Sequence, residues 1–142
     1  MARHEASILK RYRYRCVSVP GSDKVVASIP LSSFLGHATI ADGDPWSAVL
    51  RVRAIASQSN VNTGAFGAWA ETVVTVTHAT GGSGYVSFVT PDTGGFASLA
   101  PELDFDIDSG NFRILLVYTE LEANTTYLVT VDGDFVADPV PT

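Results

Sequence analysis

The chain has 142 residues, of which 46% are hydrophobic and 17% are charged, and its formal net charge is −6. This length fits one domain with a single core, and the charged fraction lies below the ~25% of an average soluble domain. Its apolar runs are shorter than the ~20 residues of a membrane-spanning helix, so we expect no membrane insertion. The N-terminal residues lack the features of a secretory signal, which predicts a protein made in a cytoplasm.

Charge is distributed unevenly along the chain. Residues 1–15 contain five basic residues against Glu5, whereas residues 100–142 contain nine carboxylates against Arg113 alone. Opposite charges at the two ends favour contacts between copies, because complementary fields set the register of an interface. We therefore expect a homo-oligomer, most readily a trimer. The single cysteine, Cys16, excludes an intrachain disulfide.

The N-terminal segment is predicted to be a strand over residues 7–19, ended by the turn dipeptide Pro20-Gly21. Its basic and aromatic residues alternate, which places the arginines on one face of the strand. That face suits an acidic protein neighbour. Two rival interpretations are nucleic-acid binding, which we rank lower, and a solvated terminus. The candidate assembly residues are Arg11, Tyr12, Arg13, Tyr14 and Arg15.

Period-two alternation and turn residues predict strands through the rest of the chain. The strongest pattern covers residues 46–57, and Pro30 marks an edge strand or a strand end because proline cannot donate to a ladder. Residues 57–67 and 90–102 are predicted as loops, 81–84 as a turn, and Asp132-Gly133 as a tight hairpin before a short strand. The predicted strands cover residues 24–31, 34–40, 46–57, 69–78, 85–90, 103–108, 112–119 and 125–131.

Strands at this spacing with no helical pattern between them are typical of a sandwich or a barrel. We predict an all-β fold, an antiparallel, jelly-roll-like β-sandwich with an extended N-terminal arm. The expected division is a basic arm or strand over residues 1–22, a β-sandwich over 23–136 and an extended tail over 137–142.

No residue pattern predicts a catalytic, cofactor-binding or metal site. The segment Asp104-Phe105-Asp106-Ile107-Asp108 departs from a calcium loop, since Ser109 stands where glycine is needed and Leu115 where a glutamate is needed. We expect its apolar residues to face inward and its carboxylates to face solvent. A small hydrolase would require convergence of two among Asp104, His78, Glu120 and Glu122.

Aromatic residues give the one indication of ligand binding. Exposed rings stack on sugar faces or pack against neighbouring subunits. The candidate residues for contact with a receptor or another surface are Phe66, Trp69 and Phe96.

Residues 44–135, about two-thirds of the chain, resemble a β module of phage tail fibres and other virion proteins. The motifs are the run from Trp46 to Ala54, the strand beginning at Ala68-Trp69, and the strand from Thr126 to Val131. The resemblance implies a rigid homotrimer displayed on the particle. The chain departs from a full fibre in its shorter length and in its basic N-terminal segment.

These observations predict a non-enzymatic virion structural protein, a short tail-fibre-like appendage or a capsid decoration protein that can contact the host surface. It would bind other virion proteins and require no cofactor, and nucleic-acid binding stays the lower-ranked interpretation of the basic segment. The alternative is a stand-alone carbohydrate-binding module that recognises a host-surface glycan.

Overall fold

A computed structural model describes residues 4–18, 21–30, 46–60, 64–78, 84–95, 101–118, 121 and 123–137. These residues form nine strands and contain no helix, so no helix among them could cross a membrane. The strands are β1 (His4–Cys16), β2 (Lys24–Pro30), β3 (Trp46–Asn60), β4 (Gly64–His78), β5 (Gly84–Phe88), β6 (Asp92–Gly95), β7 (Leu103–Asp108), β8 (Asn111–Leu116) and β9 (Thr125–Ala137).

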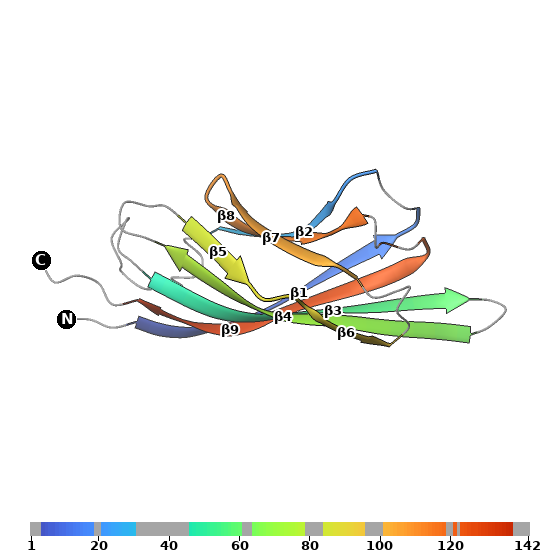
Figure 1. Ribbon diagram of the computed structural model, residues 1–142, viewed down its shortest axis with the longest axis horizontal. Helices are drawn as coiled ribbons and strands as arrows, with labels where there is room; N and C mark the ends of the chain where they lie inside the picture. The colour runs from blue at the N-terminus through green and yellow to red at the C-terminus, as the bar shows by residue number, and fades with distance from the viewer. Residues whose placement is uncertain are drawn as a thin grey trace, which may run out of the picture.

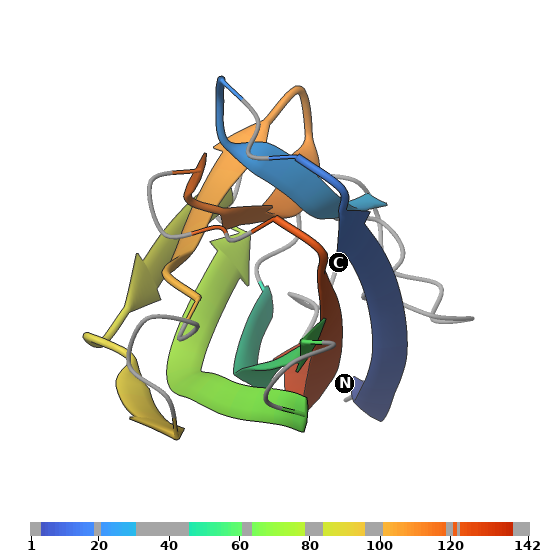
Figure 2. The same cartoon turned by 90° about the vertical axis from the view of Figure 1, so that its right-hand side faces the viewer.

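The strands form two antiparallel sheets that pack as two layers (Figures 1 and 2). The larger sheet has the order β1-β9-β3-β4-β5, with β6 also paired to β4. The smaller sheet has the order β2-β8-β7. The predicted all-β sandwich is therefore confirmed, and the predicted N-terminal strand is an edge strand of the larger sheet, paired with β9 along its whole length.

The larger sheet follows from period-two alternation in its long strands. On β3 the inward residues Ala48, Leu50, Val52, Ala54 and Ala56 are all buried, with exposures of 1% or less. The neighbouring strands β4 and β9 present small and β-branched residues to the same layer, which suits a pleated surface. The last strand of the chain, β9, lies between β1 and β3. Because His4 pairs with Ala137, the start of β1 and the end of β9 lie side by side at one end of the sheet (Figure 1).

The smaller sheet is built around the β7–β8 hairpin. Ser109 and Gly110 have φ of 50° and 79°, and Asp108 pairs with Asn111, which gives a two-residue turn of the type that matches strand twist. Pro30 ends β2, an edge strand of this sheet, as the sequence predicts.

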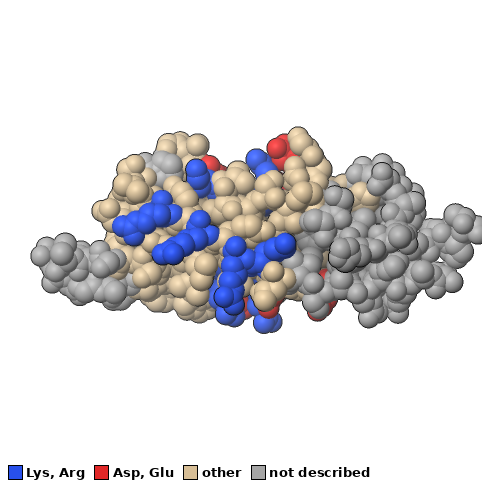
Figure 3. Space-filling view, turned by 180° about the vertical axis from the view of Figure 1, so that it is seen from behind, with Lys and Arg blue, Asp and Glu red and all other residues tan. Residues whose placement is uncertain are grey.

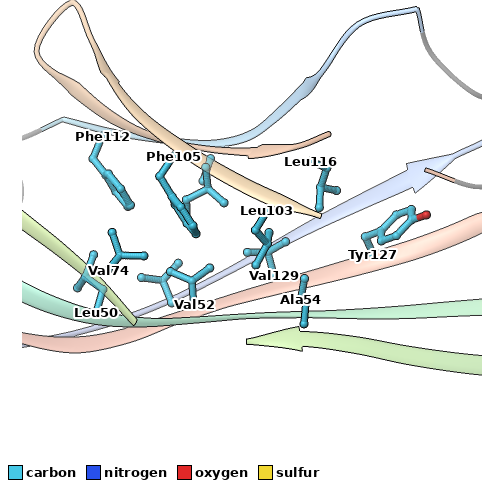
Figure 4. Packing of buried hydrophobic residues seen from close by; sticks show 14 of the residues in the cluster. Leu50, Val52, Ala54, Val74, Leu103, Phe105, Phe112, Leu116, Tyr127 and Val129 are labelled. Atoms are coloured by element: carbon cyan, nitrogen blue, oxygen red, sulfur yellow. The ribbon is translucent and has the colours of Figure 1, made fainter. Parts of the chain in front are cut away.

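The core fills the space between the two layers (Figure 4). The rings of Phe105 and Phe112 stack with centroids 6.0 Å apart, and Phe88 meets Phe105 edge-on at 4.9 Å. At the other end Tyr127, fully buried, stacks with Tyr14 at 6.4 Å. Aromatic residues therefore anchor the core between the two sheets.

Three expectations from the sequence are wrong. The loop predicted over 57–67 is largely strand, because β3 and β4 continue their ladder to the Asn60–Gly64 pair. The loop predicted over 90–102 contains β6, a short strand on the β4 edge. The Asp132-Gly133 dipeptide is not a hairpin, since β9 runs through it while pairing with both neighbours.

Gly133 lets β9 approach β3 closely and does not form a turn. A Cβ on Gly133 would collide with the carbonyl oxygen of Val49 and lie 2.8 Å from Cα of Leu50. Several other expectations lie outside the described residues: the strand over 34–40, most of the turn over 81–84, and the tail beyond Ala137. The division into arm, sandwich and tail stays a prediction.

Candidate assembly face

Each long strand of the larger sheet turns alternate side chains away from the smaller sheet. We call this solvent-facing surface of the larger sheet the outer face. It includes Leu9, Arg11, Arg13 and Arg15 on β1, Leu128, Thr130, Asp132 and Asp134 on β9, Val49, Arg51, Arg53 and Ile55 on β3, Trp69, Glu71 and Val73 on β4, and Asp92 on β6.

The outer face exposes large apolar side chains. Their exposed fractions run from 36% for Leu128 to 64% for Leu9. Leu128, Ile55 and Trp69 are neighbours across three strands, and monomeric proteins seldom leave adjoining large apolar side chains in water. The exposed apolar residues of this face are Leu9, Val49, Ile55, Trp69, Val73 and Leu128.

Charged groups lie beside these apolar residues. Nε and Nη2 of Arg53 both lie 2.8 Å from Oε2 of Glu71, and Nε of Arg51 lies 3.6 Å from Oε1. The arginines are at least half exposed, so the pairs add little to the stability of one chain. Asp132 is in register with both Leu9 and Arg51. Both charge signs therefore occur on the same face.

Two shallow hollows open on the outer face. One, of about 540 Å³, lies beside the Trp69 indole, and the other, of about 520 Å³, lies nearer the end of the sheet that holds Gly133. The first is lined by Arg53, Ile55, Gly67, Ala68, Trp69 and Glu71. The second is lined by Leu9, Val49, Leu50, Arg51, Val73, Asp132, Gly133 and Asp134.

The three arginines of β1 lie on the outer face and are exposed, as predicted from their alternation. Nη1 of Arg15 donates to Oγ1 of Thr126 at 3.1 Å. Figure 3 views the molecule from the side on which β1 lies and shows basic side chains gathered there with few carboxylates in view. The β1 side of the larger sheet is therefore a basic surface.

Tyr12 and Tyr14 lie on the opposite side of β1 and pack against the core. Burial raises the pKa of both phenols, and the neighbouring Cys16 raises that of Tyr14 further. Nζ of Lys24 lies 5.4 Å from the Tyr14 ring centroid. Both tyrosines thus pack toward the interior of their own chain, and their predicted contact with a partner stays a prediction.

Of the three aromatic candidates, only Trp69 can be placed. It is 41% exposed and lies opposite Gly94 of β6. Phe66 belongs to β4, but its side chain lies outside the described part of the structure, as does the whole of Phe96. The three are therefore not seen together on one surface.

The Asp104–Asp108 segment belongs to β7, with Phe105 buried and Ile107 packed against the core, as expected. Nε and Nη2 of Arg113 donate to the two oxygens of Asp106 at 2.7 and 2.6 Å. These hydrogen bonds, with the positive charge of Arg113, outweigh burial and hold the pKa of the Asp106 carboxyl below its ordinary value. In the described ranges, no group of three or more His, Cys, Asp or Glu is placed to hold a metal ion.

Of the candidates for hydrolase chemistry, the structure describes two, and these belong to different sheets. Asp104 belongs to the smaller sheet, and its Oδ1 accepts a hydrogen bond from its adjoining Phe105 amide at 2.8 Å. His78 ends β4 of the larger sheet. Glu120 and Glu122 lie outside the described residues.

The sequence interpretation missed most of the outer face. Ile55, Leu128 and Glu71 were not candidates, although the alternation in 46–57 already placed Ile55 opposite the buried residues of its strand. The missing information was the order of strands, because β9 separates β1 from β3.

Neither the comparison with protein-family models nor the comparison with curated proteins finds a match for this chain. Solved structures do match. The tailspike protein of Acinetobacter baumannii phage AM24 aligns with a TM-score of 0.54 and 13% identity, over 96% of this chain and 26% of the tailspike. The tailspike protein of Acinetobacter phage vB_ApiP_P1 aligns with a TM-score of 0.49 and 23% identity, over 92% and 22%.

The chain thus spans about a quarter of the length of the tailspikes it matches. Its fold resembles part of a phage tailspike, which confirms the resemblance to phage tail appendage domains noted from the sequence.

Proposed function

We propose that the chain is a non-enzymatic structural module of a phage tail appendage, assembled as a homotrimer and bound to other proteins of the virion. The observation that carries this proposal is the fold similarity to the AM24 tailspike over nearly the whole chain. A short tail-fibre-like appendage is the form we favour, with capsid decoration as the other position on the particle.

The outer face supports an assembling role. It combines exposed apolar residues with charges of both signs, the composition of a surface that meets another protein surface. The composition of the outer face therefore supports a structural role.

Gold-labelled antibodies raised against the chain, applied to purified particles and imaged by electron microscopy, test the proposal. Label at the tail is the expected result. Label spread over the capsid would assign the chain to decoration instead. Particles without label, in a preparation where a known tail protein is labelled, would contradict a virion role.

A second candidate is a carbohydrate-binding module, favoured by the exposed Trp69 beside Arg53 and Glu71 in one hollow. An indole face can stack on a sugar ring while the charged groups hydrogen-bond its hydroxyls. Titration of the chain with oligosaccharides of the host surface, read by tryptophan fluorescence, tests it. Saturable binding that is lost in Trp69→Ala would favour this function.

A further inference from the structure

The strand register divides the outer face into rows that cross the sheet. Each row takes one residue from β1, β9, β3 and β4, in that order. The first row is Arg13, Leu128, Ile55 and Trp69; the second is Arg11, Thr130, Arg53 and Glu71; the third is Leu9, Asp132, Arg51 and Val73. Because each row runs from β1 to β4, its two halves belong to two sides of the face.

The two halves of each row are chemically complementary. The β1 and β4 ends of a row are a cation and an indole in the first row, a cation and a carboxylate in the second, and two apolar side chains in the third. The inner residues of each row, on β9 and β3, also match: they can pair by apolar contact in the first row, by a hydrogen bond in the second and by opposite charge in the third. Placing the β1–β9 half of one copy on the β3–β4 half of another would pair Arg13 with Trp69, Leu128 with Ile55, Arg11 with Glu71, Thr130 with Arg53, Leu9 with Val73 and Asp132 with Arg51.

Only one orientation of two copies produces this match. A rotation axis parallel to the strands keeps every row at its own height, so each row meets the same row of the neighbour. A contact that reversed the strands would bring the first row onto the third. Leu128 would then face Asp132, and Ile55 would face Arg51, which buries charges against apolar groups. Arg11 would face Arg11 of the neighbour, and like charges repel.

We propose that the outer face is the contact between copies of this chain, formed around an axis parallel to the strands, with the β1–β9 half of one copy against the β3–β4 half of the next. The occupant of the face is thus a second copy. The hollows beside Trp69 and beside Leu9 lie at the levels of these rows and give space for the neighbour's side chains. The inference rests on the homo-oligomer of the proposed function and adds the surface, the register and the axis direction.

The acidic end of the second row offers a charge-swap test. Asp92 of β6 continues this row beyond Glu71, and it is exposed and forms no ion pair with another described residue. Arg11→Glu and Asp92→Lys should each raise the dissociation constant of the oligomer roughly tenfold, since each places like charges together. The double variant should recover part of the lost affinity, because the lysine introduced at position 92, beside Glu71, then gives the glutamate introduced at position 11 of the neighbour an opposite charge.

A second variant tests the apolar part of the contact. Trp69→Ala removes the largest exposed side chain of the first row, and loss of a central aromatic anchor should raise the dissociation constant more than about 30-fold. Tyr118→Ala is the matched control, because Tyr118 is 38% exposed and lies outside the larger sheet. All variants are studied as the full chain by native mass spectrometry, with circular dichroism confirming that the β fold persists.

Dissociation by the single variants, partial recovery in the double variant and an unchanged control support the inference. An oligomeric wild type whose mass is insensitive to all of these variants overturns the proposed surface while the oligomer itself stands. A wild type that is monomeric at every concentration overturns both the surface and the proposed homo-oligomer. Equal dissociation by Tyr118→Ala would also overturn the proposed surface, because the loss would then not depend on the outer face.

Discussion

The Trp69 indole lies against Gly94, its cross-strand neighbour on β6. A Cβ on Gly94 would lie 2.6 Å from Nε1, 2.7 Å from Cε2 and 2.8 Å from Cζ2 of the indole. The glycine therefore leaves the space that the ring occupies on the outer face. This relationship explains why a glycine-rich segment can form a strand here, and it fixes the position of the most prominent aromatic group of the face.

Gly94→Ala should displace the indole. A contact below 3 Å cannot persist, and the exposed side chain of Trp69 can move more easily than the backbone of β6. The free energy of unfolding should fall by about 1 kcal/mol, the low end of the range for overpacking. Tryptophan fluorescence should report a changed environment, and the oligomer should weaken. Unchanged emission and an unchanged oligomer mass would show that the position of the Trp69 ring does not depend on Gly94.

Gly133→Ala should destabilise the chain more strongly. Here the added Cβ would meet the backbone of Val49 and Leu50 in β3, which cannot move without breaking the ladder. We expect a loss of about 3 kcal/mol in the free energy of unfolding, measured by urea denaturation at fixed protein concentration. Gly21→Ala is the control, since no atom lies within 4 Å of the added Cβ. Equal stability of the two variants would contradict the close approach.

These two glycines show where sequence interpretation succeeds and where it stops. Alternation in residues 46–57 predicted β3, because a period of two records which side chains are buried. A glycine, however, can serve a turn or a close approach of strands, and its neighbours in sequence do not distinguish the two. Asp132-Gly133 was therefore predicted as a hairpin, and the segment around Gly94 as a loop.

The candidate site was predictable only within single strands. The arginines of β1 could be assigned to one face from their alternation, and Trp69 could be selected as an exposed aromatic. Their relation to Leu128 and Ile55 depends on β9 lying between β1 and β3. Such a non-local pairing leaves no local pattern in the sequence, so the composition of the outer face could not be predicted.

The stability of the chain should depend on pH through Asp106. Its pKa is lowered in the folded chain by Arg113, so its contribution is present above the ordinary carboxyl pKa and is lost as pH falls through the lower folded value. Asp106→Asn should therefore destabilise the chain at pH 7 and have less effect near pH 2. Thermal unfolding across this range measures the difference.

The matched control for this pH dependence is Glu102→Gln, since Glu102 is exposed and forms no ion pair with another described residue. Its unfolding temperature should follow that of the wild type at both pH values. An Asp106→Asn profile parallel to the wild-type profile would contradict a role for the Arg113 pair.

Replacing Arg11, Arg13 and Arg15 together by Ser should leave the β fold intact, because all three side chains are exposed. Assembly should weaken, and assembly of the wild type should weaken with rising salt, since charges are screened beyond ~8–10 Å at physiological ionic strength. Circular dichroism and native mass measure the two effects. Normal assembly of the variant would show that the arginines of β1 face solvent and do not contact another chain. Tight, salt-sensitive binding of the wild type to DNA would favour a nucleic-acid role instead.

The native mass of the full chain tests the central claim most directly. Measured from dilute to concentrated solution at physiological salt, it should reveal a species of three times the chain mass that becomes dominant as concentration rises. A single species at the mass of one chain over the whole range would contradict the assembly account.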